Sequence, residues 1–529
     1  MPRFFNNAGP NRPEMHYTLP MLDRLPTVRE LVGQEKWFVL HAPRQSGKTT
    51  AMRALAHELT ASGDYAALWA TCEMGEPFGD DPGNVDLLIC DDIAANARLY
   101  LPEALRPPAV DPEARQVGIL ADLLRRWCET CPRPVVLLLD EIDALRNDAL
   151  ISVLRQLRGL YPNRPHGAPV SLALIGLRDV RDYKVASEGA SHLGTASPFN
   201  VKAEGLTLGN FTAADVAALY GQHTAETGQQ FTPAAVARAF ELTQGQPWLV
   251  NALAYEITFR MKLTGTMDVP QIDAAKERLI LSRSTHLDSL ADKLNEPRVR
   301  AVLAPILAGD EVDGSIPQRD IEYCEDLGLL ARDNKLIRIA NPIYREILPR
   351  ELSWTWQRRM DVPERRWALA DGRLDIAGVR KALLAFWREH AEWMVVGQKW
   401  PEFAHQIVVM AFLQRLVNGG GTITREYGLG RKRLDLLISW HLGLDSQGIP
   451  TAEDRHAIEC KVWHDGQKDP LAKGLEQLDG YLARLGLDTG TLLLFDARST
   501  SPKGEEWETR GELSEATTPG GRTVTVLRL

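Results

Sequence analysis

The feature that most constrains the fold is the segment HAPRQSGKTTAM, residues 41–52, which joins a strongly apolar run to a helix-like stretch. The preceding run WFVLHA has the length and composition of a buried strand. From Ala42 onward the segment matches the pattern G-x-x-x-x-G-K-[ST], except that alanine replaces the first glycine. A loop of this kind, between a strand and a helix, presents its backbone N–H groups to a phosphate. The segment therefore predicts a phosphate-binding loop in an α/β domain.

The residue types in this loop have separate roles. Gly47 would let the backbone close on the phosphates, Lys48 would supply a cation, and the Thr49 hydroxyl could ligate Mg²⁺. Alanine in the first position is tolerable as long as Ala42 keeps a negative φ. The expected nucleotide-binding residues are Ala42, Pro43, Arg44, Gln45, Ser46, Gly47, Lys48, Thr49 and Thr50. The loop thus implies ATP and Mg²⁺ as cofactors.

A second motif lies downstream, in PVVLLLDEIDAL, residues 134–145. Asp140 and Glu141 follow an apolar strand, where Asp140 would hold Mg²⁺ through water and Glu141 would polarise the attacking water. An acidic pair after a strand is otherwise a common helix N-cap. Because the phosphate loop precedes it, we favour the catalytic interpretation and predict an ATPase site.

Bulk composition limits the compartment and the partners. At 529 residues the chain has room for about three or four domains. A formal net charge of −9 means that any contact with nucleic acid must come from a local basic patch. The polar N-terminal stretch lacks an apolar segment of signal-peptide type, and no apolar run approaches the ~18 residues that span a membrane. The six cysteines are scattered, as expected in a reducing cytoplasm.

The hydrophobic pattern predicts five segments. Residues 1–206 alternate apolar runs and helical stretches, which is typical of a parallel α/β sheet. The strands expected there are 37–42, 65–71, 85–90, 134–140 and 170–176. Further segments follow: a helical lid (207–295), a winged-helix-like unit of two helices and a hairpin (296–352), a Trp-rich helical linker (353–395) and a second α/β unit (396–529). The Trp-rich linker, with Trp354, Trp356, Trp367, Trp387 and Trp393, is expected to pack between domains.

The second helix of the winged-helix-like unit, PQRDIEYCEDLGLL (317–330), is unsuited to reading DNA. It carries Asp320, Glu322, Glu325 and Asp326 against Arg319. Helices that enter the major groove are usually basic, because phosphate neutralisation dominates their affinity. We therefore expect a structural or protein-contacting unit.

The N-terminal motifs resemble those of the AAA+ and STAND class of P-loop ATPases, over roughly residues 1–350. TQGQPWLV (243–250) is similar to the G-x-P lid motif of STAND proteins, carried by Gly245 and Pro247. This resemblance implies that Pro247 packs near the nucleotide, that Arg178 could act as a polar sensor, and that the protein forms a homo-oligomer. It does not identify an arginine finger.

The C-terminal unit contains a strand-like run with an unusual charge pattern, HAIECKVW (456–463). Because successive side chains in a strand alternate, Glu459 and Lys461 share one face while Ile458 and Cys460 point into the core. A surface ion pair on one pleat would stabilise the protein by about 1 kcal/mol at most. Upstream, the strand RLDLLIS carries Asp435, and the intervening loop is long enough to let the two strands pair. We expect these three charged groups to meet.

Asp435, Glu459 and Lys461 form the D…ExK pattern and resemble the PD-(D/E)XK nucleases over about residues 396–500. In the next helix Gln477 and Tyr481 are similar to the Q-x-x-x-Y motif of RecB-like nucleases, although Leu434 stands where a proline is usual. The fold class implied is α/β multidomain: a P-loop parallel-sheet ATPase with a helical lid and winged-helix-like unit, then a restriction-endonuclease-like α/β domain.

Electrostatics favours a metal between these groups. Two carboxylates about 4 Å apart repel by about 4 kcal/mol at an effective dielectric of 20, which one lysine offsets only partly. The resemblance implies Mg²⁺ bound by Asp435, Glu459 and the carbonyl of Cys460, with Lys461 activating water and Gln477 completing the catalytic set. Glu402 is either an additional acid of such nucleases or a favourable helix-dipole residue. The local basic patch would comprise Arg425, Arg431, Lys432, Arg433 and Lys473.

Together these features predict a cytoplasmic protein whose ATPase module controls a metal-dependent nuclease, with DNA as substrate and RNA not excluded. Bacterial defence or DNA processing, and a protein or phage-derived trigger, follow from family analogy alone. A competing hypothesis is a signalling or scaffold ATPase whose nuclease-like domain binds nucleic acid without cutting. The retained Asp435, Glu459, Lys461 and Gln477 argue against it. No membrane partner is expected.

Overall fold

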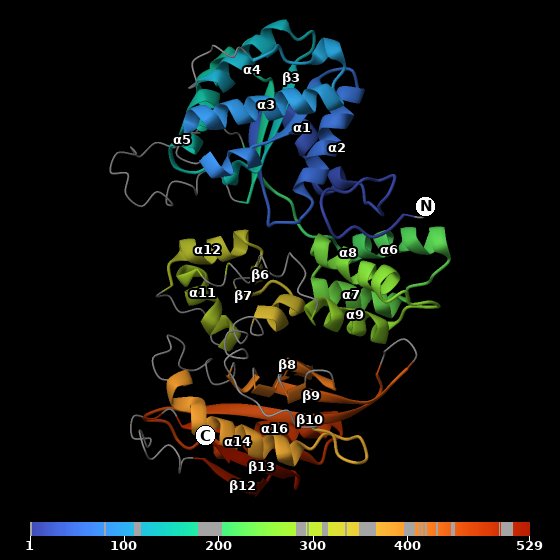
Figure 1. Cartoon of the computed structure of the whole chain (residues 1–529), viewed down its shortest axis with the longest axis vertical. Coiled ribbons are helices and arrows are strands. Elements are labelled where there is room, and N and C mark those ends of the chain that lie inside the picture. The colour runs from blue at the N-terminus through green and yellow to red at the C-terminus, as the bar shows by residue number, and fades with distance from the viewer. Residues whose placement is uncertain are drawn as a thin grey trace. The chain divides into compact units, whose positions relative to one another are not determined.

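The computed structural model forms two compact units, Met1–Tyr255 with Glu322–Leu330, and Glu256–Ile321 with Ala331–Leu529. Figure 1 labels their elements. The residues described are 3–78, 81–110, 118–177, 204–281, 293, 296–308, 316–333, 336–348, 367–395, 408–410, 412–413, 416–417, 420–429, 432–445, 450–496, 498 and 511–529. The predicted division into five segments stays a prediction.

The first unit contains a five-stranded parallel sheet, so the predicted parallel-sheet class is confirmed. Its strands are β1 (Trp37–His41), β2 (Ala66–Thr71), β3 (Val135–Asp140), β4 (Ser171–Gly176) and β5 (Glu204–Thr207), in the order β2-β3-β4-β1-β5. The strands that carry the two N-terminal motifs, β1 and β3, flank β4. Their carboxyl ends therefore open at the same edge, where α/β sheets bind ligands.

Helices cover both faces of this sheet (Figure 1). Alternate strand residues such as Val39 and Leu137 pack on α3 (Pro82–Tyr100), α4 (Ile119–Thr130) and α5 (Asn147–Leu160). The opposite residues, including Leu40 and Leu138, pack on α1 (Val28–Gly33) and α2 (Lys48–Ala61). Burial on both faces explains why these strands read as continuous apolar runs.

The expected strand 85–90 is wrong, because these residues lie inside helix α3. Asp81 caps the helix by accepting from Asn84 N, and Pro82 occupies a first-turn position that needs no N–H. The buried residues Val85, Ile89, Ile93 and Ala97 recur every four positions, which is a helical period. The short run VDLLIC conceals this period when it is viewed alone.

Helices and a small sheet are found in the segments predicted as a helical lid and a winged-helix-like unit, while the division into these domains stays a prediction. The helices in the segment 207–295 are α6 (Ala213–Thr227), α7 (Pro233–Thr243), α8 (Pro247–Tyr255) and α9 (Val269–Leu281). Then come α11 (Pro297–Ala308), α12 (Gln318–Asp326) and a two-stranded sheet of β6 (Leu330–Asp333) and β7 (Leu336–Ile339). Short 3-10 helices are η1 (Met21–Arg24), η2 (Glu73–Phe78), η3 (Glu103–Leu105), η4 (Ile142–Ala144) and η5 (Tyr161–Asn163), and a π-helical turn is η7 (Glu256–Arg260).

The C-terminal part of the second unit is a mixed six-stranded sheet of order β12-β13-β11-β10-β9-β8. The strands are β8 (Gly421–Leu429), β9 (Lys432–Leu444), β10 (Pro450–Trp463), β11 (Thr489–Asp496), β12 (Glu512–Thr517) and β13 (Thr523–Arg528). Helix α14 (Ile376–Val395) contributes to the core on one face, and α16 (Leu471–Leu485) covers the other.

The tryptophans assigned to packing between domains need a correction where they are described. Trp367 and Trp387 are buried in the core of the C-terminal sheet, together with Ile458 and Phe495. Large aromatic rings bury too much apolar area to be left at a linker when a sheet face is available. Trp354 and Trp356 lie outside the described residues. Across the described part of the chain, no helix combines the length and apolarity that a membrane crossing requires.

Candidate functional site

The phosphate loop follows β1 directly and leads into α2. Ala42 is buried and is not among the residues with positive φ, so alanine is tolerated as the first loop residue. Gln45 and Gly47 have φ values of 58° and 94°. A Cβ on Gly47 would lie 2.5 Å from Met21 Cε, the flexible end of a side chain, so the positive φ is the main reason for glycine at this position.

Lys48 is the first residue of α2 and is buried beneath the loop. Its Nζ donates to the carbonyl oxygens of Ala42 at 2.7 Å and Pro43 at 3.0 Å. Burial lowers the pKa of this ammonium group, while the charges of Glu141 and Asp140 oppose that effect. The loop therefore holds its cation through its own carbonyl groups.

Asp140 ends β3 and meets the loop, which brings together the two side chains expected at the magnesium. It is fully buried and its Oδ2 accepts from Thr49 Oγ1 at 2.7 Å. Trp69 Nε1 donates to the same oxygen at 3.1 Å, and Oδ1 accepts from Glu141 N at 2.9 Å. Three donors thus orient one carboxylate.

Glu141 occupies a left-handed conformation, with φ of 53°. Such a conformation costs a non-glycine residue about 1–3 kcal/mol and is concentrated at functional sites. Burial, followed by the nearby charges of Asp143 and Asp140, raises the pKa of Glu141 to about 7. A carboxyl group with this pKa is well matched to general-base chemistry near neutral pH.

Three residues at this site were not predicted from the sequence. Trp69 holds Asp140, and Asp143 accepts from Leu177 N at 2.9 Å. Arg24 donates from Nη1 to Ser46 O at 3.1 Å and lies over the Phe211 ring, with its guanidinium carbon 4.8 Å from the centroid. The DEID sequence offered a signal for Asp143, whereas Trp69 and Arg24 belong to no local motif.

The G-x-P turn packs tightly against the loop before α6. Gly245 has φ of 70°, its carbonyl accepts from Phe211 N at 2.8 Å, and Pro247 is buried at the start of α8. A Cβ on Gly245 would lie 1.9 Å from Phe211 O. Since Arg24 joins Phe211 to Ser46, this turn is connected to the phosphate loop.

Gly245→Ala should destabilise the first unit more than Gly228→Ala. Both glycines have positive φ, but a Cβ on Gly228 meets no atom within 4 Å. We expect Gly228→Ala to cost about 1 kcal/mol from conformation alone, and Gly245→Ala to cost about 1–3 kcal/mol more because backbone must move. Thermal unfolding checks this difference; equal losses would show that the turn relaxes freely.

A segment far along the chain also touches the phosphate loop within the first unit. Gly328, in the turn after α12, has φ of 75°, and a Cβ there would lie 2.7 Å from Pro43 Cβ. Pro43 is one of the two residues whose carbonyls hold Lys48. The end of the acidic helix is therefore close to the nucleotide-binding loop.

The C-terminal sheet brings Asp435, Glu459 and Lys461 together. Strands β9 and β10 pair antiparallel, with Ile458 opposite Leu436. Asp435 Oδ2 accepts from Cys460 N at 2.7 Å, and Lys461 Nζ donates to Glu459 Oε1 at 2.7 Å. The prediction that Ile458 and Cys460 point into the core is confirmed, since both are buried.

Helix α16 packs against β10 on the face opposite to that core. Its apolar stripe is confirmed: Leu478, Leu482 and Leu485 are buried, with Leu471 and Leu475 packed against them. Tyr481 is also buried, four residues after Gln477. The helix therefore places the Q-x-x-x-Y residues beside the sheet.

Two oxygen atoms in this region are buried without a partner, Glu459 Oε2 and Gln477 Oε1. Burial and the charge of Asp435 raise the pKa of Glu459 to about 7, against the effect of Lys461. Unpaired buried oxygens are costly, and a hard cation is one species that satisfies them. Within the described residues no cluster of three or more His, Cys, Asp and Glu side chains could hold a metal. A metal here would thus use two carboxylates, with carbonyl, amide or water oxygens.

Several predicted residues cannot be placed. Arg178, Glu402 and Arg431 lie outside the described residues, and for Arg425, Lys432 and Arg433 only the backbone is described. Lys473 is exposed on α16. The predicted basic patch therefore stays a prediction.

The strand–loop–helix geometry and the buried Asp140 define a P-loop nucleotide-binding domain of the ATPase class. Residues 32–183 match the AAA domain family. The chain thus carries an AAA-type P-loop ATPase domain, and ATP hydrolysis follows from it. Comparison with curated proteins found no match.

Several solved structures are similar to this chain at low sequence identity. A Walker-type ATPase of Pyrococcus abyssi is 13% identical, with 65% of this chain and 99% of that chain covered and a TM-score of 0.48. The RuvB Holliday junction branch migration motor of Thermotoga maritima is 14% identical (64% and 94% covered, TM-score 0.33). Cdc6p from Pyrobaculum aerophilum is 13% identical (66% and 97% covered, TM-score 0.34).

Proposed function

We propose that the protein is an ATP-controlled, metal-dependent nuclease that cleaves DNA. The observation that carries this proposal is the meeting of Asp435, Glu459 and Lys461 at one point of the C-terminal sheet, with Glu459 Oε2 unpartnered. A structural ion pair would need only Glu459 and Lys461. A second, half-buried carboxylate, that of Asp435, beside the buried Glu459 raises the electrostatic cost unless a cation or proton is bound.

In this proposal Asp435, Glu459 and the carbonyl of Cys460 hold Mg²⁺. The bound ion would polarise the phosphodiester and lower the pKa of its water. Lys461 would orient that water and stabilise the charge that develops on the phosphate oxygens. Gln477, whose Oε1 lacks a partner, would complete the polar lining. DNA is the proposed substrate, and RNA is the alternative that the same chemistry admits.

In the ATPase domain we assign nucleotide binding to the loop Ala42–Thr50 and to Pro247. Thr49 and Asp140 would hold Mg²⁺ at the phosphates, and Glu141 would activate the attacking water. Within the first unit the turn at Gly328 packs closely on Pro43, so a nucleotide-driven movement of the phosphate loop would reach this turn. Control of the nuclease by the bound nucleotide is part of the proposal. A homo-oligomer and a role in DNA processing or defence complete the proposal by analogy.

The test uses purified full-length protein with plasmid, linear duplex, single-stranded DNA and RNA, with Mg²⁺ or Mn²⁺, with and without ATP. We expect cleavage that requires a metal ion. Lys461→Ala should abolish this cleavage, whereas Lys468→Ala, at an exposed lysine in the loop between β10 and α16, should leave it unchanged. Lys48→Ala should change the ATP dependence of cleavage without removing the metal dependence.

If the wild type hydrolyses ATP and binds DNA but cuts no substrate, the scaffold hypothesis replaces the nuclease proposal. Cleavage of RNA alone would retain the chemistry and reassign the substrate. Cleavage that is identical with Lys48→Ala at every ATP concentration would contradict control by the ATPase domain.

A further inference from the structure

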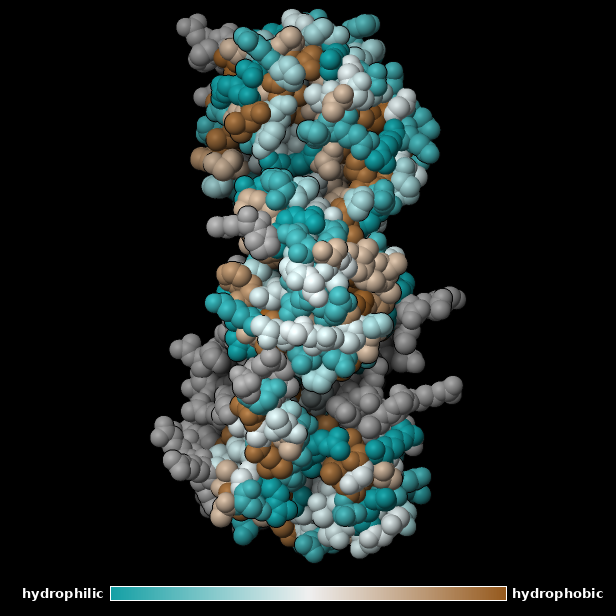
Figure 2. Space-filling view, turned by 90° about the vertical axis from the view of Figure 1, so that its right-hand side faces the viewer, coloured by the Kyte–Doolittle hydropathy of each residue, from teal (hydrophilic) through white to brown (hydrophobic). Residues whose placement is uncertain are grey.

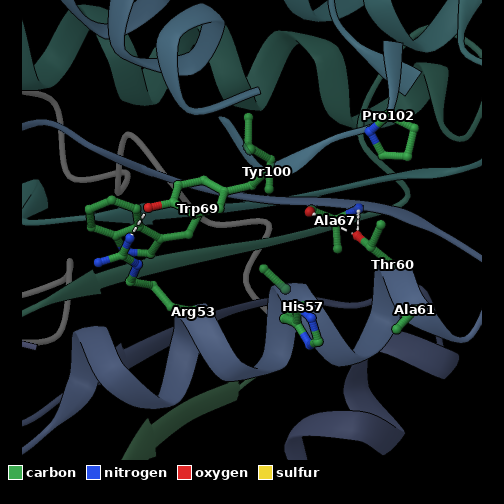
Figure 3. A pocket seen from close by; sticks show the side chains of 10 residues that line it. Arg53, His57, Thr60, Ala61, Ala67, Trp69, Tyr100 and Pro102 are labelled. Carbon is green, nitrogen blue, oxygen red and sulfur yellow. Dashed lines mark hydrogen bonds between the residues drawn. The ribbon is translucent and has the colours of Figure 1, made fainter. Parts of the chain in front are cut away.

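A pocket of about 430 Å³ lies beside strand β2, away from the phosphate loop's own residues. Helix α2 supplies one wall through residues that include Arg53 and His57, while β2 and the C-terminal end of α3, with Pro102 after it, supply the others (Figure 3). Figure 2 shows the surface of the molecule in a different view. A cavity of this size, mostly apolar with a few polar groups, is typical of small-molecule sites.

One end of the pocket holds an arginine between two aromatic rings. The Arg53 guanidinium carbon lies 5.1 Å from the Trp69 ring centroid and 5.2 Å from that of Tyr100 (Figure 3). Its Nη2 also donates to the Tyr100 hydroxyl. Within the described part of the chain Arg53 forms no ion pair, although the protein carries an excess of acidic residues. The rings orient this cation but leave its charge uncompensated, which favours an anionic ligand.

The open edge of β2 adds a donor and an acceptor beside that cation. Ala66 N and Cys72 N donate toward β3, so the peptide groups of Ala67, Trp69 and Thr71 face the other way. Thr60 Oγ1 donates to Ala67 O and accepts from Ala67 N, both at 3.1 Å. Asp92 Oδ2 accepts from Thr71 N at 2.7 Å. Among the described residues the N–H and C=O of Trp69 are left for a ligand.

We propose that this pocket binds a small aromatic anion. Its flat apolar body would pack against Ala56, Ala67 and Pro102, its carboxylate or phosphate would pair with Arg53, and a polar edge would meet the peptide of Trp69. Since Trp69 Nε1 also donates to Asp140 Oδ2, the ligand would lie one side chain from the ATPase carboxylate. Nothing in the AAA-type domain's own chemistry requires such a ligand.

The test compares naphthoate with naphthamide, two probes that differ in charge but hardly in shape. Titrations followed by saturation-transfer NMR would use the full chain with Mg²⁺ and saturating ADP, so that the phosphate loop stays occupied. We expect saturable binding of naphthoate, about tenfold weaker binding of naphthamide, and a similar loss for naphthoate with Arg53→Gln. Arg155→Gln, an exposed arginine on α5, should have no effect.

Ala61→Trp gives an independent check, because it keeps Arg53 and fills the pocket from an exposed rim position. This variant should abolish naphthoate binding while ATP turnover shows that the domain is folded. The proposal is overturned if naphthoate shows no saturable binding, if both probes bind equally, or if Arg53→Gln and Ala61→Trp bind naphthoate as the wild type does.

Discussion

Glu141→Gln is expected to bind ATP with unchanged affinity and to hydrolyse it about 10²–10⁴ times more slowly. The glutamine keeps the shape of Glu141 and the left-handed backbone, but it cannot take a proton from water. Asp140 and Thr49 keep their hydrogen bond, so the proposed magnesium site should survive. Turnover is measured by phosphate release and affinity by equilibrium binding; Glu129→Gln, an exposed residue on α4, is the control.

The pH profile gives the same prediction a second readout. The pKa of Glu141 is raised to about 7, and the base must be ionised to act. The turnover number should therefore fall as pH decreases through the neutral range, and bound Mg²⁺ should move that limb to lower pH because a cation favours the carboxylate. If Glu141→Gln hydrolyses ATP as fast as the wild type does, Asp143 rather than Glu141 is the general base.

How far the sequence alone predicts the fold depends on how local each signal is. Strands β1, β3 and β4 are continuous apolar runs with clear ends, and all three were predicted nearly to the residue. The run VDLLIC looks equally strand-like over six residues; only its cap at Asp81 and the recurrence through Ala97 reveal a helix. The strand β5 was missed because Glu204–Thr207 is short and largely exposed at a sheet edge.

The candidate sites follow the same rule. Lys48, Asp140, Glu459 and Lys461 lie in short sequence motifs, so the sequence alone identifies them as candidates. Trp69 on β2 contacts Asp140 on the neighbouring strand β3, and Arg24 in η1 donates to the backbone of Ser46. Because the partners in each pair are far apart in the sequence, no local motif links Trp69 or Arg24 to the site. Pairing of the strand that carries Asp435 with the strand that carries Glu459 was predictable, because side-chain alternation and the length of the intervening loop limit which strands can pair. The hydrogen bond from Cys460 N to Asp435 was not, because it depends on a side-chain rotamer.

Glu459→Gln should have opposite effects on cleavage and on stability. If Glu459 holds a metal as proposed, loss of its carboxylate is expected to reduce cleavage about a thousandfold or more. The same change should stabilise the metal-free protein, because burial and Asp435 raise the pKa of Glu459 from 4.5 to about 7. The folded wild type therefore holds a proton that the unfolded chain releases. As the pH rises from about 4.5 to 7, the free energy of unfolding of the wild type falls, whereas glutamine at this position does not titrate.

At pH 8 without metal, the variant should exceed the wild type in free energy of unfolding by up to about 3 kcal/mol, since one pKa unit is worth 1.36 kcal/mol. At pH 4 the two proteins should be nearly equal, because both are then neutral at this position. Mg²⁺ should raise the unfolding temperature of the wild type but not of Glu459→Gln; Glu453→Gln, an exposed residue on β10, is the control. A variant that loses stability at pH 8 would instead show that Glu459 serves Lys461 as a structural ion pair, which removes the main support for a metal at this site.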